Sequence, residues 1–186
     1  MERLSASQVI NLILPIFRDY GYDGASLTIL AKASGLSRAS LYHHFPGGKQ
    51  EMARAALSRS GAALTRLILA PLNRAESPQL KVQTMFLGVK SYYASDPPIC
   101  LMNSLTLGTG RALFGDEVNA AVQAWQVNLA HVLQNSGLSQ KASDQLATAA
   151  IERIQGALIM ARVCGTKLSF DEAIDDLAQN ISVHIS

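Results

Sequence analysis

The most constraining feature of this chain is a pair of short helical segments that meet at a single glycine. Residues 26–34 and 37–43 each have apolar side chains at helical spacing, and Gly35 lies between them. Isolated helices shorter than about 12 residues are marginal in water. The two segments must therefore be held by each other and by neighbouring helices.

The residues around Gly35 meet the steric needs of a helix-turn-helix. Ala31 is small where the second helix would cross the first, and Gly35 accepts the left-handed backbone that the turn requires. Ser37 is placed to cap the second helix. Three leucines would lock the helices together: Leu30, Leu36 and Leu41. A helix-turn-helix inserts its second helix into the major groove of DNA, so the segment predicts DNA recognition.

The rest of the chain has the same helical character. Apolar residues recur three and four positions apart through most of it, and no stretch has a convincing strand pattern. We therefore predict an all-α fold of about nine helices.

Three sites predict how individual helices bend, begin or end. Pro15 lies inside the pattern of the first helix and should bend or break it, because proline lacks an amide donor. A helix over about 49–70 is expected to stop at Pro71. Ser169 and Glu172 form the pattern of a capping box at the start of the last helix.

Composition and charge narrow the class of protein. With 48% apolar and 16% charged residues the chain should be ordered, and no apolar run reaches the roughly 18 residues of a membrane span. The start does not resemble a signal peptide, and Cys100 and Cys164 lack metal-type spacing, so a cytoplasmic protein with reduced thiols is expected. Cys100 is expected to be a buried structural thiol.

Charge is unevenly distributed along the chain. Residues 1–66 hold eight Lys/Arg and four Asp/Glu (8 − 4 = +4), while residues 67–186 hold eight and ten (8 − 10 = −2). A basic N-terminal third is consistent with a polyanionic partner, although chance alone can produce a split of this size.

A longer string of residues is far more specific than the general pattern. It consists of the run from Phe17 to Tyr22, Thr28, Leu30-Ala31, Gly35-Leu36-Ser37, the run from Ser40 to Phe45, and Lys49. This string resembles the DNA-binding signature of TetR/AcrR-type bacterial transcription regulators, over roughly residues 8–55. The resemblance implies a homodimer with a helix-turn-helix DNA-binding domain over residues 1–48 (motif 26–45). Residues 49–186 would form a helical domain for effector binding and dimerisation.

Two features depart from the commonest form of that family. Pro15 stands where a small helix-compatible residue is usual, and the segment between Phe45 and Lys49 is one residue longer. The Phe-Pro-Gly-Gly-Lys form, together with Cys100-Leu101 and Gly156-Ala157-Leu158, is similar to the LmrA-type branch. Members of that branch often control multidrug-export genes.

The resemblance implies a set of DNA contacts, carried over by position. They are Thr28, Ser37, Arg38, Ser40, Tyr42, His43 and Lys49. Hydroxyl, guanidinium and imidazole groups hydrogen-bond bases and phosphates. Ala39 is added for its own chemistry, because its methyl group could touch a thymine methyl or merely permit close approach. Lys49 has independent support as a phosphate ligand, because a helix N-terminus offers free amides and a positive dipole end. An ordinary exposed lysine is the alternative.

Apolar side chains in the body of the chain are candidates for an effector site. They are Met85, Phe86, Val89, Met102, Leu105 and Trp125. A soft, methionine-containing site would suit an apolar or aromatic small molecule, whereas the alternative is a plain hydrophobic core. The last two helices have apolar stripes with small residues, which would either form a dimer interface or pack inside one chain.

Other functional classes have little support in the sequence. We find no catalytic triad, no phosphate loop and no zinc pattern, and the adjacent acids at 116–117 and 175–176 more simply decorate helices. No cofactor or metal is expected, since His43 and His44 point about 100° apart on a helix. The protein is therefore predicted to be a repressor that a small molecule releases from operator DNA. An adaptor whose body binds another protein stays open as an alternative.

Overall fold

The computed structural model describes residues 4–185, and within them every regular element is helical. One long helix is continuous over three adjoining parts, α4 (Gly48–Leu64), η1 (Thr65–Leu69) and α5 (Ala70–Leu72). Counted in this way the described residues contain nine helices, which confirms the predicted all-α fold. The chain has two compact units, Met1–Gly61 with Cys100–Val118 and Ala62–Ile99 with Asn119–Ser186.

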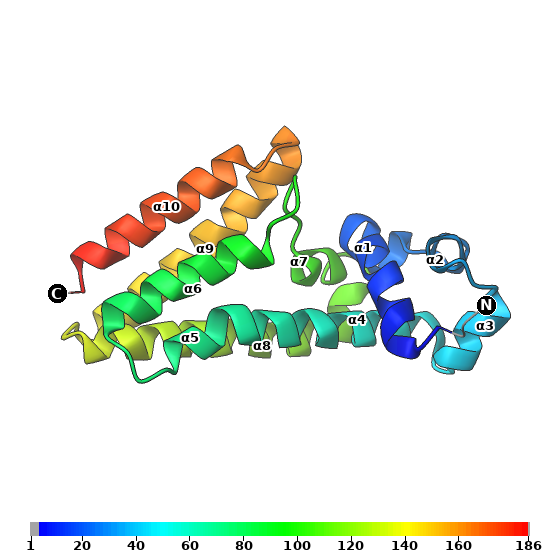
Figure 1. The fold of residues 1–186 in the computed structure, drawn as a ribbon, viewed down its shortest axis with the longest axis horizontal. Coiled ribbons are helices and arrows are strands. Elements are labelled where there is room, and N and C mark those ends of the chain that lie inside the picture. The colour runs from blue at the N-terminus through cyan, green and yellow to red at the C-terminus, as the bar shows by residue number, and fades with distance from the viewer. Residues whose placement is uncertain (1–3, 186) are drawn as a thin grey trace. The chain divides into compact units, whose positions relative to one another are not determined.

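The first unit combines the N-terminal helices with a later segment of the chain (Figure 1). Its elements are α1 (Ala6–Gly24), α2 (Leu27–Ser34), α3 (Arg38–His44), most of α4, α7 (Leu101–Leu105) and the start of α8 (Gly110–Asn135). α1 packs against both α2 and α7, and α2 packs against α3. The core of this unit includes Val9, Ile13, Phe17, Leu30 and Leu41, all fully buried. Residues 100–118 therefore belong to the unit that carries the helix-turn-helix.

The helix-turn-helix has the local structure that the sequence predicts. Ser26 and Ser37 cap α2 and α3, and their hydroxyl oxygens accept first-turn amides at 3.3 and 3.1 Å. Gly35 is left-handed, with φ of 68°. This turn lets the amide of Leu36 donate to the carbonyl of Ala31 at 3.2 Å, which closes the end of α2.

Pro15 does not break α1; the interruption of the helix lies at Gly21 instead. The helical backbone continues through the proline, and the non-helical residue is Gly21, with φ of 66° and ψ of −172°. A Cβ atom at Gly21 would lie only 2.7 Å from the carbonyl oxygen of Ser104 in α7. The hydroxyl of Ser104 in turn donates to the carbonyl of Arg18 at 2.7 Å. The kink in α1 is therefore the point where α7 docks.

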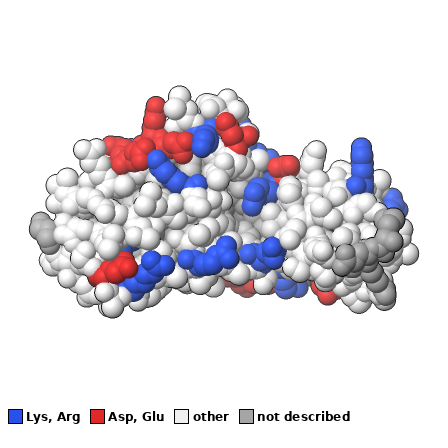
Figure 2. Space-filling model, viewed as in Figure 1, with Lys and Arg blue, Asp and Glu red and all other residues white. Residues whose placement is uncertain are grey.

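The second unit is a helical bundle. Besides η1, α5 and the rest of α8, it contains α6 (Pro78–Tyr92), α9 (Gln140–Cys164) and α10 (Leu168–Val183). α10 packs on α9 and α6, and α6 packs on η1 and α5 (Figure 1). Acidic side chains gather over α10 (Figure 2). Three of them form ion pairs within the unit, Asp175 with Lys90 at 2.6 Å, Asp171 with Lys167 at 3.5 Å and Asp176 with Arg153.

The prediction that Pro71 ends the long helix is wrong. The helix continues to Leu72, and it widens into the π turn of η1 just before the proline. A helical proline clashes with the carbonyl four residues earlier, here that of Leu67. The wide turn relieves this clash, and the carbonyl of Leu67 lies against Gly88 of α6, where a Cβ atom would be 1.8 Å away. The missing side chain of Gly88 therefore makes room for the π turn.

The predicted capping box at Ser169 is also wrong. α10 begins at Leu168, and its N-cap residue Lys167 has no side-chain cap. Instead, the carboxylate of Asp96, from a distant part of the chain, accepts the amide of Lys167 at 2.8 Å. The amide of the next residue, Leu168, donates to the hydroxyl oxygen of Thr166 at 3.3 Å, so the start of α10 combines a tertiary contact with a local one.

Within residues 4–185 no helix is long and apolar enough to cross a membrane. Cys100 is 3% exposed, as expected for a buried thiol, whereas Cys164 is exposed.

Candidate nucleic-acid interface

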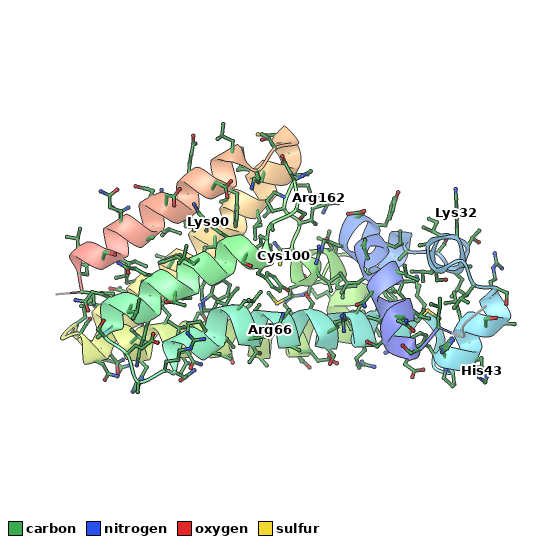
Figure 3. The ribbon with its side chains drawn as sticks, in the orientation of Figure 1. Lys32, His43, Arg66, Lys90, Cys100 and Arg162 are labelled. Carbon is green, nitrogen blue, oxygen red and sulfur yellow. The ribbon has the colours of Figure 1, made fainter. Side chains whose placement is uncertain are left out.

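The recognition helix α3 has one buried face and one exposed polar face. Leu41 and Phe45 are 0% and 4% exposed and attach the helix to the unit. The outward residues are Ser37, Arg38, Ala39, Tyr42 and His43, all exposed, and Ser40 is half-buried. His43 points away from the unit in Figure 3. Six of the eight predicted DNA contacts are thus brought together on or next to one short helix.

Thr28 and Arg38 are in direct contact across the turn. The guanidinium Nη2 of Arg38 donates to Oγ1 of Thr28 at 2.5 Å, and both residues are exposed. Thr28 lies in the first turn of α2 and Arg38 in the first turn of α3. The bond orients the guanidinium before any ligand arrives, and it places two of the predicted contacts at one spot on the surface.

Lys49 is more strongly bound than an ordinary exposed lysine. Its Nζ donates to the carbonyl of Tyr22 at 2.9 Å and lies 4.2 Å from the centroid of the Tyr22 ring. Two of the amides near the start of α4 are already bonded, Gly47 to the Glu51 carboxylate at 2.6 Å and Gly48 to a backbone carbonyl at 2.9 Å. An ammonium group has three donors, so Lys49 still has capacity for a phosphate.

Sequence reasoning missed a cluster in which three helices meet, which we call the α1–α4–α8 junction. Its members are Tyr22, Asp23, Lys49, Arg54, Thr109, Phe114 and Glu117. The Tyr22 and Phe114 rings meet edge to face, with centroids 5.3 Å apart, and Arg54 pairs with Glu117 at 2.8 Å. In the sequence, Tyr22 and Asp23 only mark the end of a helix, and nothing there pairs them with residues about 90 positions away.

Asp23 is the most densely hydrogen-bonded acid of the junction. Its carboxylate accepts the backbone amide of Thr109 at 2.9 Å and the hydroxyl of the same residue. These two hydrogen bonds, with a smaller contribution from the charge of Lys49, hold the pKa of Asp23 below its ordinary value of 3.8. A lowered folded pKa means that the stabilisation is complete above pH 3.8 and is lost only as the pH falls through the folded value. The contact is therefore intact at neutral pH.

The six candidate effector residues are all buried, but they do not belong to one unit. Met102 and Leu105 lie on α7 in the first unit, at 5% and 0% exposure, and the other four lie in the second unit. There the indole N–H of Trp125 donates to the sulfur of Met85 at 3.4 Å, deep in the core. Sulfur is a weak acceptor, so this indole group is incompletely satisfied.

The apolar stripes predicted for the last two helices are buried inside the second unit. Ile154 and Leu158 of α9 and Ile174 of α10 are at most 2% exposed. A different face of α9 is exposed, and it carries Ala149, Gly156, Ile159, Met160 and Val163. Three of these are large apolar residues at 55%, 52% and 74% exposure. A surface available for a partner therefore lies on α9, opposite the buried stripe.

Comparison with known proteins agrees with this geometry. Residues 13–56 match the model for bacterial regulatory proteins of the tetR family. Residues 81–176, just over half of the chain, match the C-terminal domain of LmrA/YxaF-like transcriptional regulators. The HTH-type regulator YxaF of Bacillus subtilis is 24% identical over 84% of each chain. The regulator LmrA of the same organism is 22% identical, covering 84% of this chain and 86% of its own.

Solved structures show the same fold. A TetR transcriptional regulator from Legionella pneumophila superposes with a TM-score of 0.81 at 20% identity, covering 100% of this chain and 99% of its own. A TetR regulator from Chloroflexus aurantiacus gives 0.77 at 20% identity, covering 95% and 93%. The family consists of DNA-binding transcriptional regulators that dimerise, not of enzymes. The two family models together show that the chain belongs to the TetR family, in its LmrA/YxaF-like branch.

Proposed function

We propose that the protein is a sequence-specific repressor, released from its operator by a small apolar or aromatic effector. The observation that carries this proposal is the polar outer face of α3, whose inner face is buried through Leu41 and Phe45. Residues 1–48 form the DNA-binding domain in this proposal, and residues 49–186 bind the effector and the second subunit. The site of action would be the cytoplasm, where bacterial DNA is found.

The proposal assigns the dimer interface to the last two helices. Members of this family dimerise. The exposed apolar face of α9 supports placing the dimer interface on this helix. A two-fold dimer would present two copies of α3 to successive major grooves, about 34–36 Å apart. An effector that binds better to a dimer with another spacing weakens DNA binding by its differential affinity.

The effector site is proposed among the four candidate residues that lie in the second unit, Met85, Phe86, Val89 and Trp125. The Met85–Trp125 contact supports a ligand that combines aromatic surface with one hydrogen-bond acceptor, because such a group would satisfy the indole N–H better than sulfur does.

Selection from a random DNA pool is the direct test of the DNA-binding proposal. The full-length protein should enrich a palindromic sequence, and fluorescence anisotropy should show affinity that falls steeply with salt. Enrichment of no sequence would refute sequence-specific recognition. Repression, as opposed to activation, is tested by transcription in vitro from a promoter that contains the selected site.

Arg38→Ala should weaken binding to the selected operator by about 1–3 kcal/mol, roughly 5- to 150-fold. The guanidinium, already oriented by Thr28, is expected to form two hydrogen bonds to a base edge. Arg38→Lys is the matched control, since it keeps the charge but not the planar fork and should recover little specificity. An equal loss on unrelated DNA would place Arg38 on a phosphate instead.

Lys49→Ala should weaken binding to every DNA sequence alike. It should also reduce the slope of log affinity against log salt by about 0.9, the value for one phosphate contact. Anisotropy titrations on operator and scrambled DNA at several salt concentrations measure both quantities. A loss confined to the operator would show that Lys49 does not contact a phosphate.

A further inference from the structure

The Asp23–Thr109 contact connects the loop between α7 and α8 to Lys49, the residue proposed to contact a DNA phosphate. Thr109 lies between α7 and α8, and the carboxylate of Asp23 holds it through both the backbone amide and the hydroxyl. Asp23 also follows Tyr22, whose carbonyl accepts the hydrogen bond from Lys49. That carbonyl belongs to the peptide group that joins Tyr22 to Asp23, and peptide groups are planar and rigid. Fixing Asp23 therefore fixes the acceptor that orients Lys49.

We infer that Asp23 is a positioning residue for Lys49, and that the loop between α7 and α8 thereby controls a DNA contact. The inference rests on the proposed function, because it requires Lys49 to bind a phosphate. Lysine side chains have many rotamers, and ordering one on binding carries an entropy cost. A lysine already held by a fixed carbonyl and ring avoids part of that cost.

Other contacts at the junction show that the loop and α8 are closely fitted to this end of α1. A Cβ atom on Gly110 would lie 3.2 Å from the Tyr22 Cβ atom and 2.0 Å from the carbonyl oxygen of Leu105 in α7. The ring of Tyr22 contacts Phe114 as well as Lys49. A displacement of α7 would therefore reach Tyr22 and Asp23 through direct packing.

Positioning and simple electrostatics predict opposite results for Asp23→Ala. Removal of a carboxylate near the DNA surface should strengthen binding to a polyanion if only charge matters. If Asp23 positions Lys49, the substitution should instead weaken operator binding by about 2- to 12-fold, the cost of ordering one long side chain. Asp23→Asn retains an acceptor for Thr109, so its affinity should stay at or above that of the wild type.

A double-mutant cycle provides the decisive test. Operator affinity is measured by anisotropy for the wild type, Asp23→Ala, Lys49→Ala and the double variant, with thermal unfolding as a control for folding. Asp23→Ala should weaken binding in the wild-type background and have no further effect in the Lys49→Ala background. Equal losses in both backgrounds, or tighter binding by Asp23→Ala, would overturn the inference.

Thr109→Val tests the same link by changing the loop residue instead of Asp23. It replaces Asp23→Ala in the test if that variant fails to fold. It removes the hydroxyl donor but keeps the backbone amide, so a smaller loss than that of Asp23→Ala is expected, again only when Lys49 is present. Thr109→Ser should restore wild-type affinity. Failure of the proposed function is distinguishable, because then the wild-type protein itself would select no DNA sequence. If the wild type selects an operator but Thr109→Val and Asp23→Ala leave its affinity unchanged, only the positioning role is wrong.

Discussion

Replacing Gly88 with alanine should lower the free energy of unfolding by about 3 kcal/mol, the upper end of the usual cost of overpacking. The added Cβ atom would lie 1.8 Å from the carbonyl oxygen of Leu67. This oxygen belongs to the backbone of the π turn, so no side-chain rotation can relieve the clash. Thermal unfolding should show a melting temperature lower by roughly 6–12 °C for a chain of this size.

Gly61→Ala is a matched control for the Gly88 prediction. Gly61 is also helical, and a Cβ atom there would meet nothing within 4 Å. Alanine should therefore stabilise the protein at this position by up to about 1 kcal/mol, because it is the better helix former. Equal destabilisation by both substitutions would contradict the steric account. A neutral Gly88→Ala variant would show that α6 can move away from η1.

The helix-turn-helix could be predicted closely because its determinants are local. The caps at Ser26 and Ser37 and the left-handed turn at Gly35 involve residues only a few positions apart. Their chemistry restricts the backbone directly, so the sequence pattern indicates both the elements and their ends. The same reasoning succeeded for the outer face of α3, because burial of Leu41 and Phe45 determines which side chains point outward.

Predictions failed where a distant contact replaced a local preference. Pro71 does not end its helix, because a π turn and the space at Gly88 accommodate it. Ser169 does not cap α10; Asp96, 71 positions away, accepts the amide of Lys167, and Thr166 accepts that of Leu168. Asp23 and Thr109, 86 positions apart, show no sign of their pairing in the sequence. Local chemistry predicts elements, but the pairing of elements depends on packing that one sequence does not reveal.

Replacing Ile159 with glutamate should convert the protein from a dimer to a monomer at micromolar concentration. Ile159 is 55% exposed on α9, next to Met160 and Val163, on the face that we assign to the interface. A two-fold interface contains each residue twice, and a buried unpaired charge costs several kcal/mol. Sedimentation velocity should show the monomer, and operator affinity should fall by at least about 100-fold, which corresponds to roughly 3 kcal/mol.

Leu87→Glu makes the same chemical change outside the last two helices. Leu87 is 67% exposed on α6, so glutamate there should leave both the dimer and operator binding intact. A monomeric Leu87→Glu variant beside a dimeric Ile159→Glu variant would move the interface to α6. If both variants stay dimeric, neither face forms the interface. Loss of operator binding by an Ile159→Glu variant that remains dimeric would instead indicate that α9 affects the spacing of the two recognition helices.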